Sequence, residues 1–187
     1  ADFARQASSA RDDAIDLFRI ALELASREQE AEDVNRVRYI LAYLYFMRGD
    51  FYHSAVLGEA LARRYPEGVD PKDCASIAAK AYRLMIIECR DSSADPTYAT
   101  HRLKNLGNYV ISRWDGTPQA DDICLLLIDT AIEQQELDLA LELLDKIAED
   151  SPRRGAAEML LGQILWSNYV ASGRLEEESR PSTEEMA

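Results

Sequence analysis

The sequence predicts an all-α fold of about eight antiparallel helices joined by short connections, and three observations predict it. The 187-residue chain holds only 8 glycines and 6 prolines, and leucine and alanine far outnumber valine, a balance that favours helix over strand. Apolar residues recur at helical spacing on both sides of Gly49-Asp50. No segment alternates apolar and polar residues between turn signals, as a half-buried strand would.

A helical hairpin between Arg38 and Pro66 is the clearest element. Glycine at position 49 suits the left-handed conformation that ends a helix, and Asp50 is a strong N-cap for the helix that follows. The sequence therefore predicts one helix over about 31–48 and its partner over about 50–65.

Capping residues mark the other helices. Before the hairpin, 2–8 predicts a short helical start, and 9–12 resembles a capping box that opens a helix to about Arg27. After it, four dipeptides place a capping side chain before a proline at the first helical position: Asp70-Pro71, Asp95-Pro96, Thr117-Pro118 and Ser151-Pro152. A further helix is expected from near Glu136 to near Asp150, and the second hairpin turn near Gln135-Glu136.

The chain also carries an internal repeat. Leu127 and Leu161 lie 34 positions apart, and so do Pro118 and Pro152. Pro66 precedes Pro118 by 52 positions, so the unit between them holds about 18 extra residues. A fixed period of this length indicates stacked helix pairs, because one pair cannot bury its apolar face alone.

The repeated residues follow a known pattern, W-x2-L-G-x2-Y, then A-x3-F, then P. The matches are Leu41-Ala42-x2-Tyr45 with Pro66, then Leu127, Ala140-x3-Leu144 with Pro152, then Leu161-Gly162, and Ala14-x3-Phe18 at the front. On these residues the chain resembles the tetratricopeptide repeat family over roughly 10–175, although no tryptophan stands at the motif's first position. The resemblance implies a right-handed superhelix of antiparallel helix pairs over 1–171, followed by an acidic, mobile tail over 172–187. It also implies that Ala42 and Gly162 lie where two helix backbones touch.

Composition limits the classes of partner. The net charge of −13 repels phosphate backbones and anionic lipid surfaces, so no nucleic-acid partner is expected. No run of about 18 apolar residues exists, so no transmembrane segment is expected. The compartment, cytoplasmic or periplasmic, stays open.

Catalytic motifs are missing from the sequence. His53 and His101 are the only histidines, and neither belongs to a metal-binding motif; His53, just after the Gly49-Asp50 turn, is expected at the surface or in a satisfied position. Cys74, Cys89 and Cys124 have no C-x-x-C spacing and are expected as small buried hydrophobic residues. Because the chain also lacks phosphate-binding loops and nucleophile signatures, we expect no catalytic residue, metal or cofactor, and no enzymatic activity.

Aromatic residues form the candidate site. Tyr39, Tyr43 and Phe46 share one helix face at offsets of four and three, and the resemblance places them in a concave groove with Gln163 and Trp166. The alternative is that these aromatics pack against neighbouring helices. The family's carboxylate-binding groove has Lys and Asn where this chain has Tyr39 and Tyr43, so a peptide C-terminus is not the expected ligand.

Three functional hypotheses follow. The first is an interaction module that binds a peptide or helix of another protein in its groove, with preference for flanking Lys or Arg. The second is a structural segment of a larger repeat scaffold that self-associates through its C-terminal repeat. Leu161, Leu165 and Trp166 would be partly uncovered there, and we expect the tail or another copy to cover them. The third is an all-α enzyme, which would require a pocket of convergent titratable groups.

Overall fold

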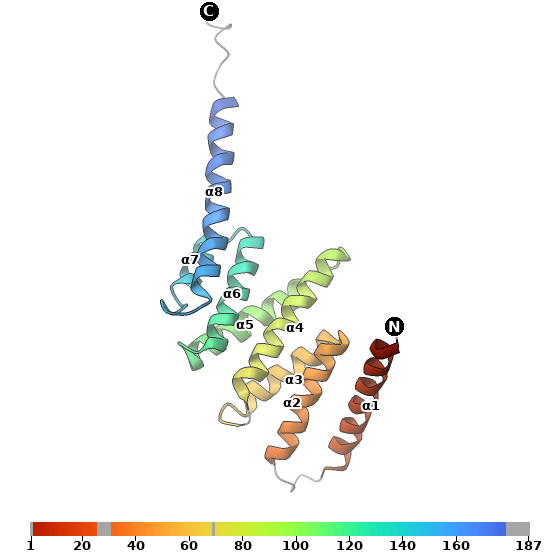
Figure 1. Ribbon diagram of the computed structural model, residues 1–187. Coiled ribbons are helices and arrows are strands. Elements are labelled where there is room, and N and C mark those ends of the chain that lie inside the picture. Colours follow the sequence, from red (N-terminus) through yellow and green to blue (C-terminus); the bar gives the residue numbers. More distant parts are fainter. Residues whose placement is uncertain (1, 26–30, 69, 179–187) are drawn as a thin grey trace, which may run out of the picture.

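The computed structural model describes residues 2–25, 31–68 and 70–178, and its secondary structure within these ranges is entirely α-helical (Figure 1). This confirms the predicted all-α class. The helices are α1 (Asp2–Leu24), α2 (Ala31–Arg48), α3 (Phe51–Arg64), α4 (Pro71–Asp91), α5 (Thr97–Trp114), α6 (Pro118–Glu133), α7 (Leu137–Leu144) and α8 (Arg154–Glu178). Within the described ranges, none of them is both long and apolar enough to cross a lipid bilayer.

The hairpin of α2 and α3 turns at Gly49, as predicted. Gly49 has a φ of +84°, its N–H donates to Phe46 O over 3.0 Å, and the Asp50 N–H donates to Tyr45 O over 2.9 Å. These two bonds form a Schellman motif, which satisfies carbonyls that a helix end leaves free. Asp50 then caps α3 by accepting a bond from the His53 N–H.

The second predicted turn, between α6 and α7, has the same form without a glycine. Gln135 takes a φ of +62° and donates its N–H to Ile132 O over 3.0 Å, while the Glu136 N–H donates to Ala131 O over 2.8 Å. Glutamine carries a Cβ, so this left-handed position is less favourable than at glycine and is held by the two bonds.

The four proline joints are not equivalent. The Thr117-Pro118 joint is as predicted, because Thr117 accepts from the Ala120 N–H and Pro118 is the first residue of α6. Pro71 likewise begins α4, but the prediction that Asp70 caps it is wrong. Asp70 has a φ of +47°, and its side chain forms no capping bond.

The other two prolines lie before the first helical residue. α5 begins at Thr97, with Pro96 as its N-cap, and Asp95 accepts from the Thr97 N–H over 2.9 Å. α8 begins at Arg154, so Ser151-Pro152 belongs to the turn that precedes it. In both places the capping side chain bonds two residues onward, which forms a turn rather than a helix N-cap.

Three helix ends differ from the prediction. α1 runs unbroken through 9–12, so no capping box starts there, and the predicted end at Arg27 lies outside the described residues. α7 ends at Leu144 rather than near Asp150. α8 continues through Gly173 to Glu178, while 179–187 of the predicted tail lie outside the described residues.

The extra residues of the unit after Pro66 lengthen its helices, because α4 and α5 have 21 and 18 residues against 16 and 8 in α6 and α7.

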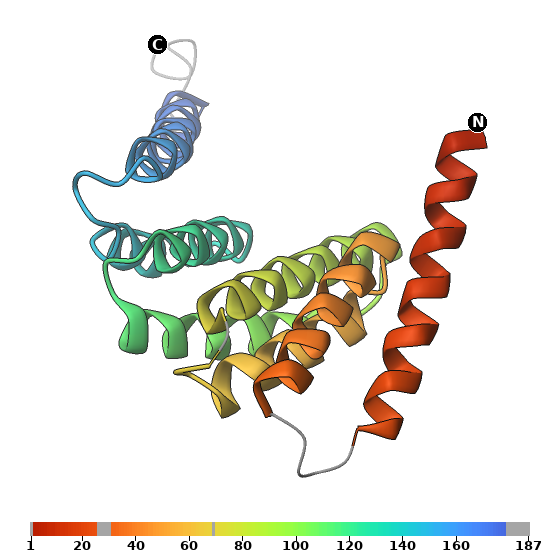
Figure 2. The same cartoon turned by 60° about the horizontal axis from the view of Figure 1, so that its bottom comes forward.

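The helices are arranged as pairs that follow one another (Figure 2). The first helices of the pairs form a continuous row, because α2 contacts α4, α4 contacts α6 and α6 contacts α8. We call α2, α4, α6 and α8 the first-helix row. The second helices lie between them: α3 packs on α2 and α4, α5 on α4 and α6, and α7 on α6 and α8, while α1 packs on the outer side of α2.

Helices α3 and α4 make a close contact. A Cβ on Gly58 would lie 2.7 Å from Cys74 O and 3.2 Å from Ala78 Cβ, so only glycine fits there. This contact belongs to the main core, which extends from Ala55 to Leu161, while a smaller core of Ile15, Leu41 and Tyr45 joins α1 to α2.

The two predicted small contacts have opposite outcomes. Ala42 is fully buried, in agreement with the prediction. The prediction for Gly162 is wrong, because this residue is exposed and a Cβ there would meet nothing within 4 Å. α8 faces its neighbours with Ala157 and Leu161 instead, and Gly162 is turned away.

Candidate functional site

The predicted aromatic residues of α2 divide between the core and the solvent. Tyr43 is 49% exposed, and Met47, one turn later, is 51% exposed. Tyr39 and Phe46 are half-buried against the main core. Burial, followed by the negative charge of the nearby Asp73, raises the pKa of Tyr39 above its ordinary value. On α2, therefore, Tyr43 is the predicted residue available for contact.

The predicted residues of α8 lie on an exposed stripe. Gln163 is exposed and Trp166 is 66% exposed. Met159 precedes them on the same face, and the ring of Tyr169 lies 5.8 Å from that of Trp166. We call Met159, Gln163, Trp166 and Tyr169 the α8 stripe. Met159 and Tyr169 were missed by the sequence reasoning, although their spacing of seven and three from Trp166 would have identified them.

Tyr43 and Trp166 lie on helices of the same row, but the two side chains do not contact each other. α4 and α6 stand between α2 and α8 in the first-helix row. A single ligand that touched both would have to run across the row, as an extended segment or a helix can.

The middle of the row is held by an ionic cluster that sequence reasoning did not identify. Arg83 on α4 is 7% exposed and donates from Nε to Asp129 over 3.0 Å and from Nη1 to Glu133 over 2.8 Å, both on α6. Arg90 pairs with Glu133 as well. Burial opposes ionisation of Glu133, but the bonds from Arg83 and Arg90 outweigh it and lower the Glu133 pKa.

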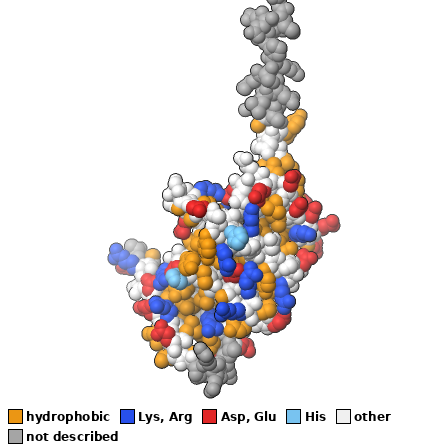
Figure 3. Space-filling model, turned by 180° about the vertical axis from the view of Figure 1, so that it is seen from behind, with side chains coloured by type: hydrophobic (Ala, Val, Ile, Leu, Met, Phe, Trp, Pro, Cys, Tyr) orange, Lys and Arg blue, Asp and Glu red, His pale blue; other side chains and the backbone are white. Residues whose placement is uncertain are grey.

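The opposite side of the molecule, formed by α3 and α5, carries both histidines (Figure 3). Both are exposed, which the sequence had predicted for His53, and His53 Nδ1 lies 2.7 Å from Asp50 Oδ1. Hydrophobic side chains gather between the histidines in this view. Tyr52 and Tyr98 are 51% and 50% exposed here, with ring centroids 6.4 Å apart.

Beneath this face lies a buried carboxylate. Glu59 is 2% exposed and accepts bonds from Tyr82 Oη over 2.7 Å, Arg63 Nε over 2.7 Å and Arg102 Nη2 over 2.6 Å. Burial raises the pKa of Tyr82, and the bond with Tyr82 raises that of Arg102. Because the three donors come from α3, α4 and α5, this cluster joins these helices.

The three cysteines differ in their burial, and two of them are inert. Cys74 and Cys124 are buried, which confirms the prediction for them, and Cys89 is half-buried. Burial and neighbouring aspartates raise the pKa of Cys74 and of Cys124 to about 12, so both thiols stay protonated at neutral pH. In the described ranges, His, Cys, Asp and Glu form no group of three or more placed to hold a metal ion.

Exposed aromatic residues therefore lie on both sides of the molecule, Tyr43 and Trp166 on the first-helix row and Tyr52 and Tyr98 on α3 and α5. Aromatic side chains supply large contact areas and dominate interface energetics when they enter pockets of a partner. Comparisons of the chain with protein-family models, with curated proteins and with solved structures found no match.

Proposed function

We propose that this chain is a non-enzymatic interaction module of the tetratricopeptide type, which binds a peptide or helix of another protein along its first-helix row. The observation that carries the proposal is the exposure of Tyr43 and Trp166, at 49% and 66%, on helices of that one row. Each of these side chains leaves a large apolar area in contact with solvent, which burial in a pocket of a partner would remove from water.

The contact pattern supports a groove on this side. The first helices contact one another directly, whereas α3 and α5 are linked through long side chains, as where Tyr109 on α5 donates to Ala62 O on α3 over 3.1 Å. A row of closely spaced helices backed by more widely spaced ones curves toward the closer row. The first-helix row is then the inner face of a right-handed superhelix over 1–171.

The net charge of the chain indicates the kind of partner. Asp129 and Glu133 at the centre of the row are paired with Arg83 and Arg90, so the indication comes from the whole chain, whose net charge is −13. Partners with Lys or Arg beside their apolar residues would be favoured, mainly through faster association.

Peptides selected from a random phage-displayed library against the immobilised chain test this function. We expect Tyr43→Ala and Trp166→Ala each to lower the affinity for the selected peptides by about tenfold or more. The melting temperature should change little, because both side chains are largely in solvent. Tyr52→Ala is the matched control, since Tyr52 is 51% exposed but lies on α3, at the opposite face.

Two results would contradict the proposal. Failure of the library to enrich any sequence would remove the groove as a peptide site. Equal weakening by Tyr52→Ala and Tyr43→Ala would show that binding does not follow the first-helix row. A large fall in the melting temperature of Tyr43→Ala would instead assign that residue to the core.

A second candidate function is self-association into a scaffold, and the ends of the row favour it. α1 exposes Leu17, Ile20 and Leu24 on one face, at 67%, 51% and 78%, and α8 exposes its stripe. α1 packs on α2 in the manner of a second helix, and α8 packs on α6 and α7 in the manner of a first helix. The α1 face of one copy could therefore pack against the α8 stripe of another copy.

Sedimentation velocity over a wide range of concentration separates the two functions. Self-association predicts that the sedimentation coefficient rises with concentration. In Leu17→Glu and in Trp166→Glu the coefficient should stay at the monomer value. A concentration-independent monomer would exclude the scaffold role.

A further inference from the structure

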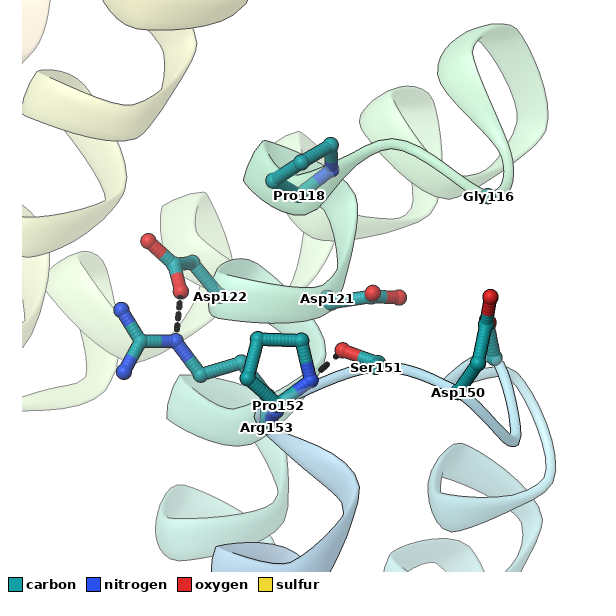
Figure 4. Close-up of a pocket in the computed structure, with 9 residues that line it drawn as sticks. Gly116, Pro118, Asp121, Asp122, Asp150, Ser151, Pro152 and Arg153 are labelled. Carbon is teal, nitrogen blue, oxygen red and sulfur yellow. Dashed lines mark hydrogen bonds and ion pairs between the residues drawn. The ribbon is translucent and has the colours of Figure 1, made fainter.

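A cavity of about 450 Å³ opens between the start of α6 and the turn that precedes α8 (Figure 4). Gly116, with a φ of +68°, forms one wall, and the 150–153 turn forms the facing wall. The cavity lies at the connecting ends of the helices and includes none of the aromatic residues proposed to bind a peptide.

Asp121 on the first turns of α6 is the unusual residue of this cavity. It is 4% exposed, and its Oδ1 is enclosed without a hydrogen-bond partner. Figure 4 shows its carboxyl group directed into the space beside Asp150. A buried carboxylate that no donor meets is costly, so such a group is normally paired with a cation or with hydrogen-bond donors.

The cation that lines the cavity does not provide this pairing. Arg153 binds Asp122 through its Nε. In Figure 4 this pair extends away from Asp121, on the other side of α6's first turns. Asp121 and Asp150 therefore leave the cavity with an excess of negative charge.

We propose that this cavity binds a guanidinium group, presented as an arginine side chain of another polypeptide. A guanidinium is planar and carries five N–H donors, so it can meet carboxylates on two sides at once. Asp121 and Asp150 offer such a pair, and Ser151 Oγ adds an acceptor that already takes the Arg153 N–H over 3.2 Å. Guanidinium is also less strongly hydrated than ammonium, which suits a site whose main acceptor is buried.

The unpaired state of Asp121 is consistent with a binding role rather than a structural one. A carboxylate retained only for stability would be satisfied by the protein, as Glu59 is by three donors. The positive end of the α6 dipole lies beside Asp121 and stabilises its charge until a cation arrives.

Titration with Nα-acetylarginine methylamide tests the site directly, followed by backbone amide chemical shifts. We expect saturable shifts at Gly116, Asp121 and the 148–153 turn, with a dissociation constant on the order of 1 mM for so small a probe. The citrulline analogue has the same shape without charge and should give no saturable response. A lysine analogue should bind at least several-fold more weakly; equal binding would overturn the guanidinium assignment.

Asp121→Asn keeps the shape of the side chain and removes its charge. We expect it to abolish the saturable shifts and to leave the melting temperature of the free protein unchanged or higher, because an unpaired buried charge has been removed. Asp138→Asn, in the first turn of α7 and outside the cavity, is the control that should bind normally.

Asp150→Asn provides a second variant at an exposed position, where folding is not in question. It should weaken the arginine probe by several-fold. Unaltered binding to Asp121→Asn, a lowered melting temperature of that variant without ligand, or shifts confined to other parts of the chain would each overturn the proposal. Because the probe contains no apolar anchor, its binding does not depend on whether the aromatic row binds peptides.

Discussion

Replacement of Glu59 by leucine is the sharpest test of how the helix pairs are held together. The carboxylate of Glu59 links three helices, since it accepts from Arg63 on its own helix, Tyr82 on α4 and Arg102 on α5. Leucine fills most of the same volume but accepts no bond. The change therefore removes the interactions with little loss of packing.

The cost can be worked out group by group. Tyr82 is fully buried, so its hydroxyl would lose its acceptor in a site without water, which costs about 1–3 kcal/mol. Arg63 and Arg102 have side chains 37% and 39% exposed and can turn to solvent, so each adds about 0–1 kcal/mol. We expect Glu59→Leu to lower the free energy of unfolding by about 1–5 kcal/mol, a large part of the roughly 5–15 kcal/mol typical of a domain.

Urea denaturation followed by far-UV circular dichroism measures this loss. Glu158→Leu is the matched control, because Glu158 also pairs with an arginine one turn away, at 2.9 Å from Arg154, but its side chain is 53% exposed. The control should change the free energy of unfolding by less than about 0.5 kcal/mol.

A double mutant separates the buried hydroxyl from the charges. Adding Tyr82→Phe to Glu59→Leu removes the stranded hydroxyl and should recover about 1–2 kcal/mol of the loss. The reasoning is refuted if Glu59→Leu costs less than about 1 kcal/mol, or if the double mutant is no more stable than the single one.

Three further predictions concern packing, acid stability and thiol reactivity. Gly58→Ala should lower the free energy of unfolding, measured by thermal or urea denaturation, by about 1–3 kcal/mol, because its Cβ would lie 2.7 Å from a backbone oxygen. Gly162→Ala, whose Cβ would meet nothing within 4 Å, should raise the free energy of unfolding by up to about 1 kcal/mol. Similar effects at the two sites would contradict the helix packing. Glu133 has a pKa below its ordinary 4.5, so its ion pairs stabilise the fold fully above about pH 4.5 and are lost as the pH falls through the lowered value. The melting temperature of the wild type should therefore approach that of Glu133→Gln in acid. A difference between the two melting temperatures that is constant with pH would argue against these pairs. A maleimide should label half-buried Cys89 well before Cys74, whose pKa is raised to about 12, and the opposite order by mass spectrometry would contradict the burial of Cys74.

The parts of the fold that the sequence predicted correctly depend on short-range interactions. Both hairpin turns lie where predicted, because each needs only a left-handed residue and two backbone bonds to the helix just before it. The Thr117-Pro118 joint is also local. The Asp70 cap was wrong although its motif is the same, because Asp70 itself adopts a left-handed conformation that turns its side chain from the helix end.

The candidate site was predicted less completely than the fold. Helical spacing placed Tyr39, Tyr43 and Phe46 on one face, but that face straddles the boundary between core and solvent. Which of them is exposed depends on α3 and α4, whose positions relative to α2 no local pattern encodes. The unpaired carboxylate of Asp121 could not be predicted either, because two adjacent aspartates near the start of a helix indicate only an acidic first turn.

The sequence by itself determined the helical class and its two hairpin turns, since periodicity, capping and glycine conformation act within a few residues of each other. Only the tertiary structure decided which small residue is a close contact. Gly58 is such a contact, because Cys74 and Ala78 from the next pair come against it. Gly162 matched the repeat and is exposed, because α8 turns another face toward α6 and α7. Burial is set by residues distant in the chain, and so it required the helices to be placed in space.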